Sequence, residues 1–267
     1  HTRFALVSWA RNVYKRQAQS DNLPQTAAPS PGAFQEVFTR RLAEGADSIV
    51  CICLSSGVSA TMESAELGAR ETDGEVRIVD SRSVTAGLGA MVVAAAEAAA
   101  GGAGADEIVS MVEAMRERTH VYGAIDTLEN LKKGGRIGNA QALLGSLLSI
   151  KPLIDISSGV VEEAGRQRTR RKSLAWLRDK VAEHADDIEI LSVMHAQADD
   201  IGDLTGMLES IVAPGITRVG VIGPVVALFY TPVAAHVSLP HIYKQHPTYS
   251  KQKQTQHYTI GTTTPRY

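Results

Sequence analysis

Two segments rich in hydroxyl groups are the places in this sequence where a small ligand could bind. Residues 55–61 read Ser-Ser-Gly-Val-Ser-Ala-Thr, and residues 80–87 read Asp-Ser-Arg-Ser-Val-Thr-Ala-Gly. Each follows an apolar run typical of a strand and precedes a helical pattern. Ligands on open parallel sheets gather at the carboxyl ends of strands, where helix N-termini offer free N–H groups. The hydroxyls of Thr61 and Thr85 could therefore hold one negatively charged group, such as a carboxylate.

Three neighbours complete this candidate ligand site. Ser56 and Ser59 supply further hydroxyls, and the small residue Gly87 would leave room for an apolar part of the ligand. A structural interpretation of the same residues remains open, because Ser and Thr often cap helices and close turns. Ser59 or Thr61 could cap the helix that follows, and Thr85 could close a turn.

A catalytic interpretation is the main alternative from another class of function. A small-molecule α/β serine hydrolase could use Ser56 or Ser59 as the nucleophile, with His195 as the base and Asp80 to orient it. The local order of residues 55–59 lacks the Gly-x-Ser-x-Gly elbow that such a nucleophile turn requires. His195 follows a predicted strand, where a single histidine is usually structural.

The composition of the chain argues against some classes of function and partner. The chain has 267 residues, 44% of them hydrophobic, and a formal net charge of −2. Aromatic residues make up only 5%, so a nucleic-acid partner is not expected. No apolar run approaches the roughly 20 residues that a membrane helix requires, so we expect a cytoplasmic location.

The sequence also predicts no bound cofactor or metal. Cys51 and Cys53 are the only cysteines, and their spacing on an apolar strand favours packing over a disulfide or a metal pair. Neither a Gly-x-G-x-x-G fingerprint nor a Walker-type Lys-Ser/Thr pair is present to bind a nucleotide.

Alternating strands and helices predict an α/β fold with two domains. In the first, residues 25–115, a parallel sheet is flanked by helices, and its first strand could be missing. In the second, residues 116–226, a mixed sheet with helices includes a hairpin about residues 157–159. Residues 1–24 and 227–267 are atypical in composition. The predicted strands are 48–54, 76–79, 120–125, 152–156, 160–163, 188–194 and 217–222, and the predicted helices are 31–44, 59–71, 88–100, 106–118, 172–183 and 199–211.

The run from Asp126 to Asp155 is the most distinctive stretch of the chain. It predicts a helix capped by Thr127, a left-handed stop at Gly134, and a second helix. That helix would bury a set of apolar side chains: Ile137, Leu143, Leu144, Leu147 and Leu148. Its glycines suit turn formation better than a phosphate cradle.

This run resembles the DegV family of fatty-acid-binding proteins, whose members carry D-T-L-E-x-L-x-x-G-G-R-I-G followed by A-x-L-L-G-S-L-L-x-I-K-P. The resemblance covers roughly residues 25–226. It extends to Pro-Ser-Pro-Gly at 29–32, to both hydroxyl-rich segments, to Arg-Thr-Arg at 168–170 and to Ile-Gly-Pro-Val at 222–225.

The resemblance implies a lipid-binding subunit that is not itself an enzyme. It would hold a long-chain fatty acid by its carboxylate, using Thr61 and Thr85, and bury the acyl chain between its domains. Contact with a membrane surface would be transient, and a separate ATP-using fatty acid kinase would form an acyl phosphate for phospholipid metabolism. Arg168 and Arg170 would face that kinase. The alternative is that this basic cluster is simply exposed to solvent, which is the usual case for a run of charges.

The two ends of the chain depart from the family pattern. Family members begin with a strand and a polar turn that residues 1–22 do not show, and the family histidine that contacts the carboxylate is replaced by Phe229. The sequence predicts little fixed structure beyond residue 227. Residues 12–17 resemble translated adapter sequence and the tail resembles a frame-shifted read, so a damaged reading frame encoding an unstable chain is a third hypothesis.

Overall fold

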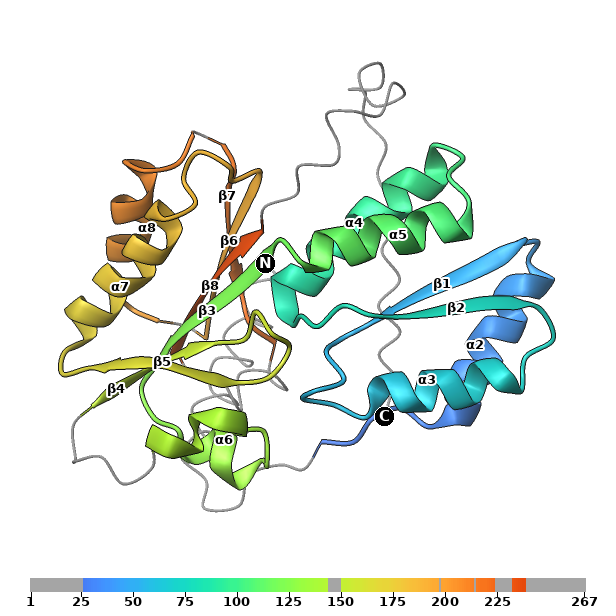
Figure 1. Ribbon diagram of the computed structural model, residues 1–267, viewed down its shortest axis with the longest axis horizontal. Coiled ribbons are helices and arrows are strands. Elements are labelled where there is room, and N and C mark those ends of the chain that lie inside the picture. Colours follow the sequence, from blue (N-terminus) through green and yellow to red (C-terminus); the bar gives the residue numbers. More distant parts are fainter. Residues whose placement is uncertain (1–25, 144–149, 197, 214, 224–231, 239–267) are drawn as a thin grey trace, which may run out of the picture.

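The molecule is built around two separate β-sheets (Figure 1). The computed structural model describes residues 26–143, 150–196, 198–213, 215–223 and 232–238. We call the two-stranded sheet and its four helices the small lobe, and the six-stranded sheet with its helices the large lobe. The predicted α/β fold, with one parallel and one mixed sheet, is confirmed.

In the small lobe, two parallel strands lie between two pairs of helices. Figure 1 shows α2 and α3 on one side of β1 and β2, with α4 and α5 on the other. Buried side chains of β2, α4 and α5, among them Met91, Val112 and Met115, form the core of this lobe. The bounds are α2 Pro31–Ala43, β1 Ser48–Cys53, α3 Thr61–Arg70, β2 Glu75–Asp80, α4 Thr85–Ala100 and α5 Ala105–Arg116.

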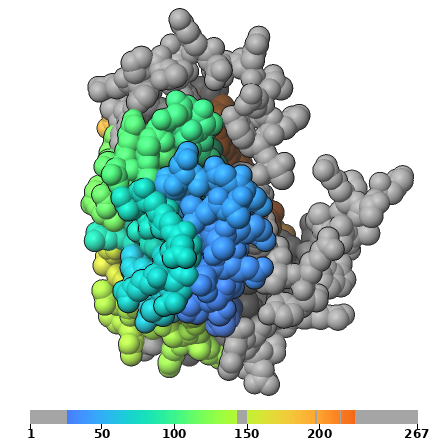
Figure 2. Space-filling model, turned by 90° about the vertical axis from the view of Figure 1, so that its right-hand side faces the viewer, coloured from blue at the N-terminus to red at the C-terminus, as the bar shows by residue number. Residues whose placement is uncertain are grey.

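The start of α2 shows how local sequence fixes these helices. Ser30 is the N-cap, and its hydroxyl accepts a hydrogen bond from the N–H of Ala33 at 3.3 Å. Pro31 occupies the first helical position, where a missing N–H costs nothing. The helix then packs against α3, and both lie on the outer face of the small lobe in Figure 2.

The large lobe contains six strands in the order β5-β4-β3-β8-β6-β7. The predicted hairpin is confirmed, because β4 and β5 pair antiparallel on either side of residues 156–161. The sheet packs against α7 and α8, and their shared core includes Leu191 of β6, Leu177 of α7 and Leu204 of α8. The bounds are β3 Thr119–Ile125, α6 Glu129–Lys133, η1 Gly138–Leu143, β4 Lys151–Asp155, β5 Glu162–Gln167, α7 Arg170–Ala182, β6 Ile190–His195, α8 Ile201–Glu209, β7 Thr217–Val221 and β8 Pro232–Ser238.

The strand β8 forms within the segment beyond residue 227, where the sequence predicts little fixed structure. It pairs antiparallel with β3 on one side and with β6 on the other, so it lies inside the sheet. Two ladders satisfy its backbone groups and stabilise a segment whose residues show no strong strand pattern. Its only proline, Pro232, stands at the first position, where a strand tolerates the missing N–H.

The Asp126–Asp155 run folds differently from the prediction in two details. Thr127 does accept a hydrogen bond from the N–H of Glu129, at 3.1 Å. The left-handed residue is Gly135, with φ of +70°, whereas Gly134 has φ of −81°. The described part of the second helix, Gly138–Leu143, is a 3-10 helix, and Leu144, Leu147 and Leu148 lie outside the described residues.

Within the described part of the chain, every helix is too short or too polar to cross a membrane.

Candidate functional site

Asp80, the last residue of β2, joins the two hydroxyl-rich loops. Its carboxylate accepts hydrogen bonds from the Ser56 hydroxyl at 2.5 Å and from the N–H of Arg82 at 2.8 Å. A backbone bond also links the loops, because the N–H of Ser55 donates to the carbonyl of Ser83 at 2.9 Å. The parallel register pairs the last residues of both strands, so the loops leave the same edge of the sheet.

The first of these loops leads into α3, which begins at Thr61. The hydroxyl oxygens of Ser59 and Thr61 are 2.8 Å apart, and the N–H of Thr61 donates to Ser59 Oγ at 3.3 Å. Ser59 therefore bonds to the backbone at the first residue of the helix, whose N-cap is Ala60 and has no side-chain capping bond. Thr61 is half-buried at the positive end of the helix dipole, where a carboxylate would be stabilised.

The second loop contains unusual backbone conformations. Thr85 has φ of +50° and Arg82 has φ of +46°, and they are the only non-glycine residues with positive φ in the described ranges. A left-handed conformation of this kind costs of order 1–3 kcal/mol and is concentrated at ligand-binding and active sites. Since Thr85 is the first residue of α4, the strained residue stands where a helix N-terminus could meet an anion.

Gly87 packs closely against neighbouring residues, and its part in leaving room for a ligand stays a prediction. A Cβ at this position would overlap Ser83 Oγ and lie 3.1 Å from Cγ2 of Thr119. The glycine therefore allows α4 to pack closely against its own preceding loop and against β3.

Ser83 is a candidate that the sequence analysis missed. Its side chain is 1% exposed, and its hydroxyl has no hydrogen-bond partner in the part of the chain that the structure describes. A buried hydroxyl without a partner costs about 1–3 kcal/mol. No sequence pattern distinguishes it from its neighbour Ser81, whose hydroxyl donates to the Ser83 carbonyl at 3.2 Å.

The described residues do not assemble the triad of a serine hydrolase. Asp80 bonds directly to Ser56, with no histidine between them. Nδ1 of His195, at the end of β6, accepts a hydrogen bond from the N–H of Ala198 at 3.2 Å. Burial lowers the pKa of His195.

The two cysteines lie side by side on β1 as free thiols, with their sulfur atoms 3.8 Å apart. The hydrogen bond between them lowers the pKa of Cys51 and, together with burial, raises that of Cys53. Within the described residues, no group of three or more histidine, cysteine or carboxylate side chains could hold a metal ion.

A stacked aromatic cluster between β3 and α7 was also missed. The rings of His120 and His184 are stacked with centroids 4.5 Å apart, and His120 also stacks on Tyr122. Trp176 meets Tyr122 edge-on, and the Lys180 ammonium lies 5.8 Å from the centroid of the Tyr122 ring. Burial, and then the charge of His184, lower the pKa of His120. These residues are too far apart in sequence for any motif to reveal the contact.

The two arginines predicted to meet a partner have different surroundings. Arg168 is exposed, whereas the Arg170 guanidinium forms a bidentate ion pair with Asp200 at 2.6 and 3.1 Å. Arg170 also donates to the carbonyl of Ala124 at 3.2 Å, so it joins α7, β3 and the start of α8. The Arg170 side chain lowers the pKa of Asp200, mainly through this hydrogen bonding.

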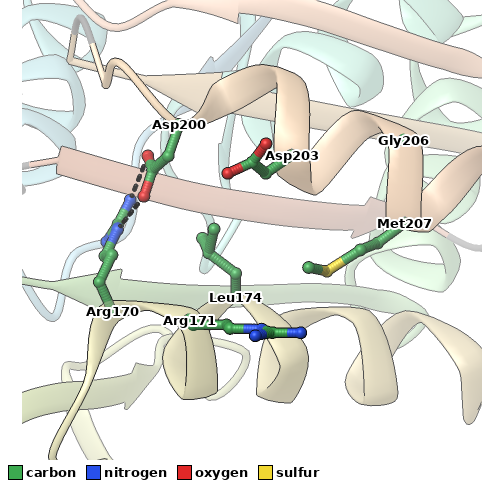
Figure 3. Close-up of a pocket in the computed structure, with 7 residues that line it drawn as sticks. All are labelled: Arg170, Arg171, Leu174, Asp200, Asp203, Gly206 and Met207. Atoms are coloured by element: carbon green, nitrogen blue, oxygen red, sulfur yellow. Dashed lines mark hydrogen bonds and ion pairs between the residues drawn. The ribbon is translucent and has the colours of Figure 1, made fainter.

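A pocket of about 550 Å³ opens beside this ion pair. Figure 3 shows that it lies between α7 and α8, with Leu174 and Met207 as its apolar part and the Arg170–Asp200 pair at one end. Its lining residues come from the large lobe, so it is separate from the loops that carry Thr61 and Thr85.

Comparison with known proteins explains the distinctive run. The family model described as "Uncharacterised protein, DegV family" matches residues 8–238. The match extends beyond residues 25–226 at both ends, so the expectation that family-like sequence stops there is wrong. Phe229, the expected replacement for the family histidine, lies outside the described residues.

Relatives and solved structures agree with this match. A DegV domain-containing protein of Streptomyces coelicolor is 39% identical over 200 residues, which are 74% of this chain and 69% of the relative. A DegV family protein from Thermus thermophilus, whose structure is described as showing fatty acid binding, has a TM-score of 0.78 and 30% identity, covering 86% of this chain and 85% of that protein. A fatty acid binding DegV family protein from Streptococcus agalactiae has a TM-score of 0.79 and 25% identity, covering 86% and 83%. The chain belongs to the DegV family.

Proposed function

We propose that the protein binds a fatty acid and holds its carboxylate at the edge of the small-lobe sheet. The observation that carries this proposal is the geometry of the two loops, which start α3 and α4 at one edge and are joined through Asp80. Thr61 and Thr85 would donate to the carboxylate, and the two helix N-termini would favour its charge. The acyl chain would lie between the lobes.

The similar proteins of known structure support the choice of ligand. The Thermus thermophilus and Streptococcus agalactiae proteins are both described as fatty acid binding, and both align with more than four fifths of this chain. A single carboxylate also suits this site, since one threonine hydroxyl begins each helix.

Mass spectrometry of lipid extracted from the purified protein tests the ligand directly. We expect a fatty acid in near-stoichiometric amount, and less of it in Thr61→Val. Thr205→Val is the matched control, because Thr205 has a similar hydroxyl, bonded to the Gly202 carbonyl at 3.1 Å, on α8. A well-folded wild type without lipid, or equal loss in both variants, would contradict the proposal.

We further propose that the loaded protein presents the carboxylate to a separate, ATP-using fatty acid kinase, and that it does not itself catalyse the reaction. Arg168 is suited to meet such a partner because it is exposed at the turn between β5 and α7. Arg170 is less suited, since Asp200 already binds its guanidinium.

The docking role can be measured as acyl-phosphate formation by the kinase, trapped as the hydroxamate. Arg168→Ala should slow turnover without lowering fatty-acid content. Arg218→Ala is the control, because Arg218 is an exposed arginine on β7. Equal turnover in both variants would reject docking through Arg168, and product formed without the kinase would reject the non-catalytic role.

The protein would work in the cytoplasm and touch the membrane surface only to exchange fatty acid. Transfer of a fluorescent fatty acid from phospholipid vesicles should then load the protein, while sedimentation leaves it in the supernatant. Stable co-sedimentation with the vesicles would contradict a transient contact.

A further inference from the structure

The turn of the β4–β5 hairpin reaches from the large lobe into both ligand loops of the small lobe. The Ser55 hydroxyl donates a hydrogen bond to the carbonyl of Gly159, at the tip of this turn. The same oxygen accepts the N–H of Gly57 at 3.2 Å, and Ser55 is only 1% exposed. One buried serine thus links the hairpin turn to the first loop, while its own N–H is bonded to Ser83 in the second.

The contact between turn and loops has no spare space. A Cβ on Gly57 would lie 2.6 Å from Cγ1 of Val160 and 2.7 Å from the Gly159 carbonyl oxygen. Gly159 has φ of +93°, and a Cβ there would lie 2.9 Å from Ser55 Oγ and 3.0 Å from Cβ of Arg82. The tip of the turn therefore fits between the loop after β1 and the loop after β2.

Apolar side chains reinforce this contact. Val84, the residue before Thr85, is 6% exposed and belongs to a cluster with Val121 and Ile156 of the large lobe. Val58, in the first loop, packs against the same cluster. Each loop thus packs a valine against the large lobe, which makes separation of the loops from that lobe costly.

The turn itself is held firmly to the large-lobe sheet. The Ser157 hydroxyl accepts the N–H of Val121 at 3.1 Å and donates to the Asp155 carboxylate at 2.5 Å. The N–H of Ile156 donates to the Val121 carbonyl at 2.8 Å. A turn fixed in this way can determine the position of whatever rests on it.

We infer that the turn Ser157–Val160 is a positioning element for ligand binding, which holds the two loops so that Thr61 and Thr85 reach the same carboxylate. Residues 157–160 touch no ligand in this role and act through Ser55, Gly57 and Arg82. The inference rests on the proposed function, and it adds that affinity for the fatty acid depends on docking between the lobes.

A matched pair of glycine variants tests this role. Gly159→Ala introduces a Cβ into the contact, whereas Gly165→Ala, in β5 of the same hairpin, has its nearest neighbour at 3.8 Å, Cδ1 of Leu153. Both glycines have positive φ, +93° and +128°, so both variants carry a backbone penalty. We expect Gly159→Ala to weaken oleate binding by the delipidated protein at least tenfold, and Gly165→Ala to leave it within twofold.

Amide hydrogen exchange without ligand provides a readout that does not depend on the proposed function. Exchange at residues 55–61 and 82–87 should rise in Gly159→Ala and stay unchanged in Gly165→Ala. Equal exchange in the two variants would overturn the inference. A wild type that binds no oleate would contradict the proposed function, while the exchange result would still decide the positioning role.

Ser55→Ala and Ser55→Thr provide a second test if Gly159→Ala does not fold. Loss of the donor in Ser55→Ala should raise loop exchange and weaken oleate binding, and the hydroxyl of Ser55→Thr should restore part of both. Unchanged exchange in Ser55→Ala would count against the inference.

Discussion

Thr85 combines a strained backbone with a proposed ligand hydroxyl, so the effects of a substitution on stability and on affinity can be separated. The left-handed conformation at φ of +50° costs a non-glycine residue roughly 1–2 kcal/mol. Glycine avoids this cost but loses about 0.5–1 kcal/mol through the entropy of the unfolded chain. Thr85→Gly should therefore be about 0.5–1 kcal/mol more stable than Thr85→Ala.

The comparison with Thr85→Ala is the useful one, because both variants lack the hydroxyl and only glycine relieves the strain. Both should bind fatty acid more weakly, since a hydrogen bond to a charged group contributes about 1.5–3 kcal/mol, or about 10- to 150-fold in affinity. Thr85→Ser keeps the hydroxyl and should keep most of the affinity.

Urea unfolding of the delipidated variants measures the first effect, and calorimetric titration with oleate measures the second. If Thr85→Gly is less stable than Thr85→Ala, the positive φ at this residue does not lower the stability of the folded protein. If both variants bind oleate as tightly as the wild type, Thr85 is not a donor to the carboxylate.

Three further predictions follow from buried or paired groups. Ser83→Ala should leave the free energy of unfolding unchanged or raise it by about 1 kcal/mol, because its buried hydroxyl has no partner within the described residues; a clear loss in urea unfolding would contradict this. The ion pair with Arg170 lowers the pKa of Asp200. The contribution of this pair to the free energy of unfolding is therefore complete above the unfolded-state pKa of about 3.9 and is lost as pH falls through the lower folded-state pKa. The free energy of unfolding of Asp200→Asn should therefore vary less with pH in that range than that of the wild type. Equal pH dependence in the two proteins would refute this role of the ion pair. The folded pKa of His120 is lowered, so the unfolded state takes up a proton first, and stability should fall as pH drops below about 6.5. Between pH 8 and 5.5, the melting temperature of His120→Gln should fall less than that of the wild type. Replacement of His184, which is stacked on His120, provides a second check.

Local patterns in the sequence were sufficient to predict the order of the helices and strands up to β7. The apolar runs before residues 55 and 80 predicted two parallel strands, and the hydroxyl-rich segments after them predicted the loops that start α3 and α4. These features depend on neighbouring residues, so periodicity and capping residues are enough to find them.

Contacts between distant residues could not be predicted in the same way. The ion pair of Arg170 with Asp200 and the stack of His120 on His184 each join segments that only the folded sheet brings together. Ser83 illustrates the same limit, because its hydroxyl lies beside Gly87 where α4 packs against Thr119 of β3. Conformation at a single residue, as at Thr85, also leaves no periodic pattern.

The position of β8 has a consequence for how the large lobe forms during synthesis. Residues 119–125 pair with residues 232–238, so the sheet's central contact joins segments more than a hundred residues apart. Until residue 238 has left the ribosome, β3 with β4 and β5, and β6 with β7, are two unjoined sheet fragments with unpaired edges. Non-local pairing of this kind is slow and leaves strand edges available for wrong partners. The last described strand therefore sets the time at which the large lobe can become a single sheet.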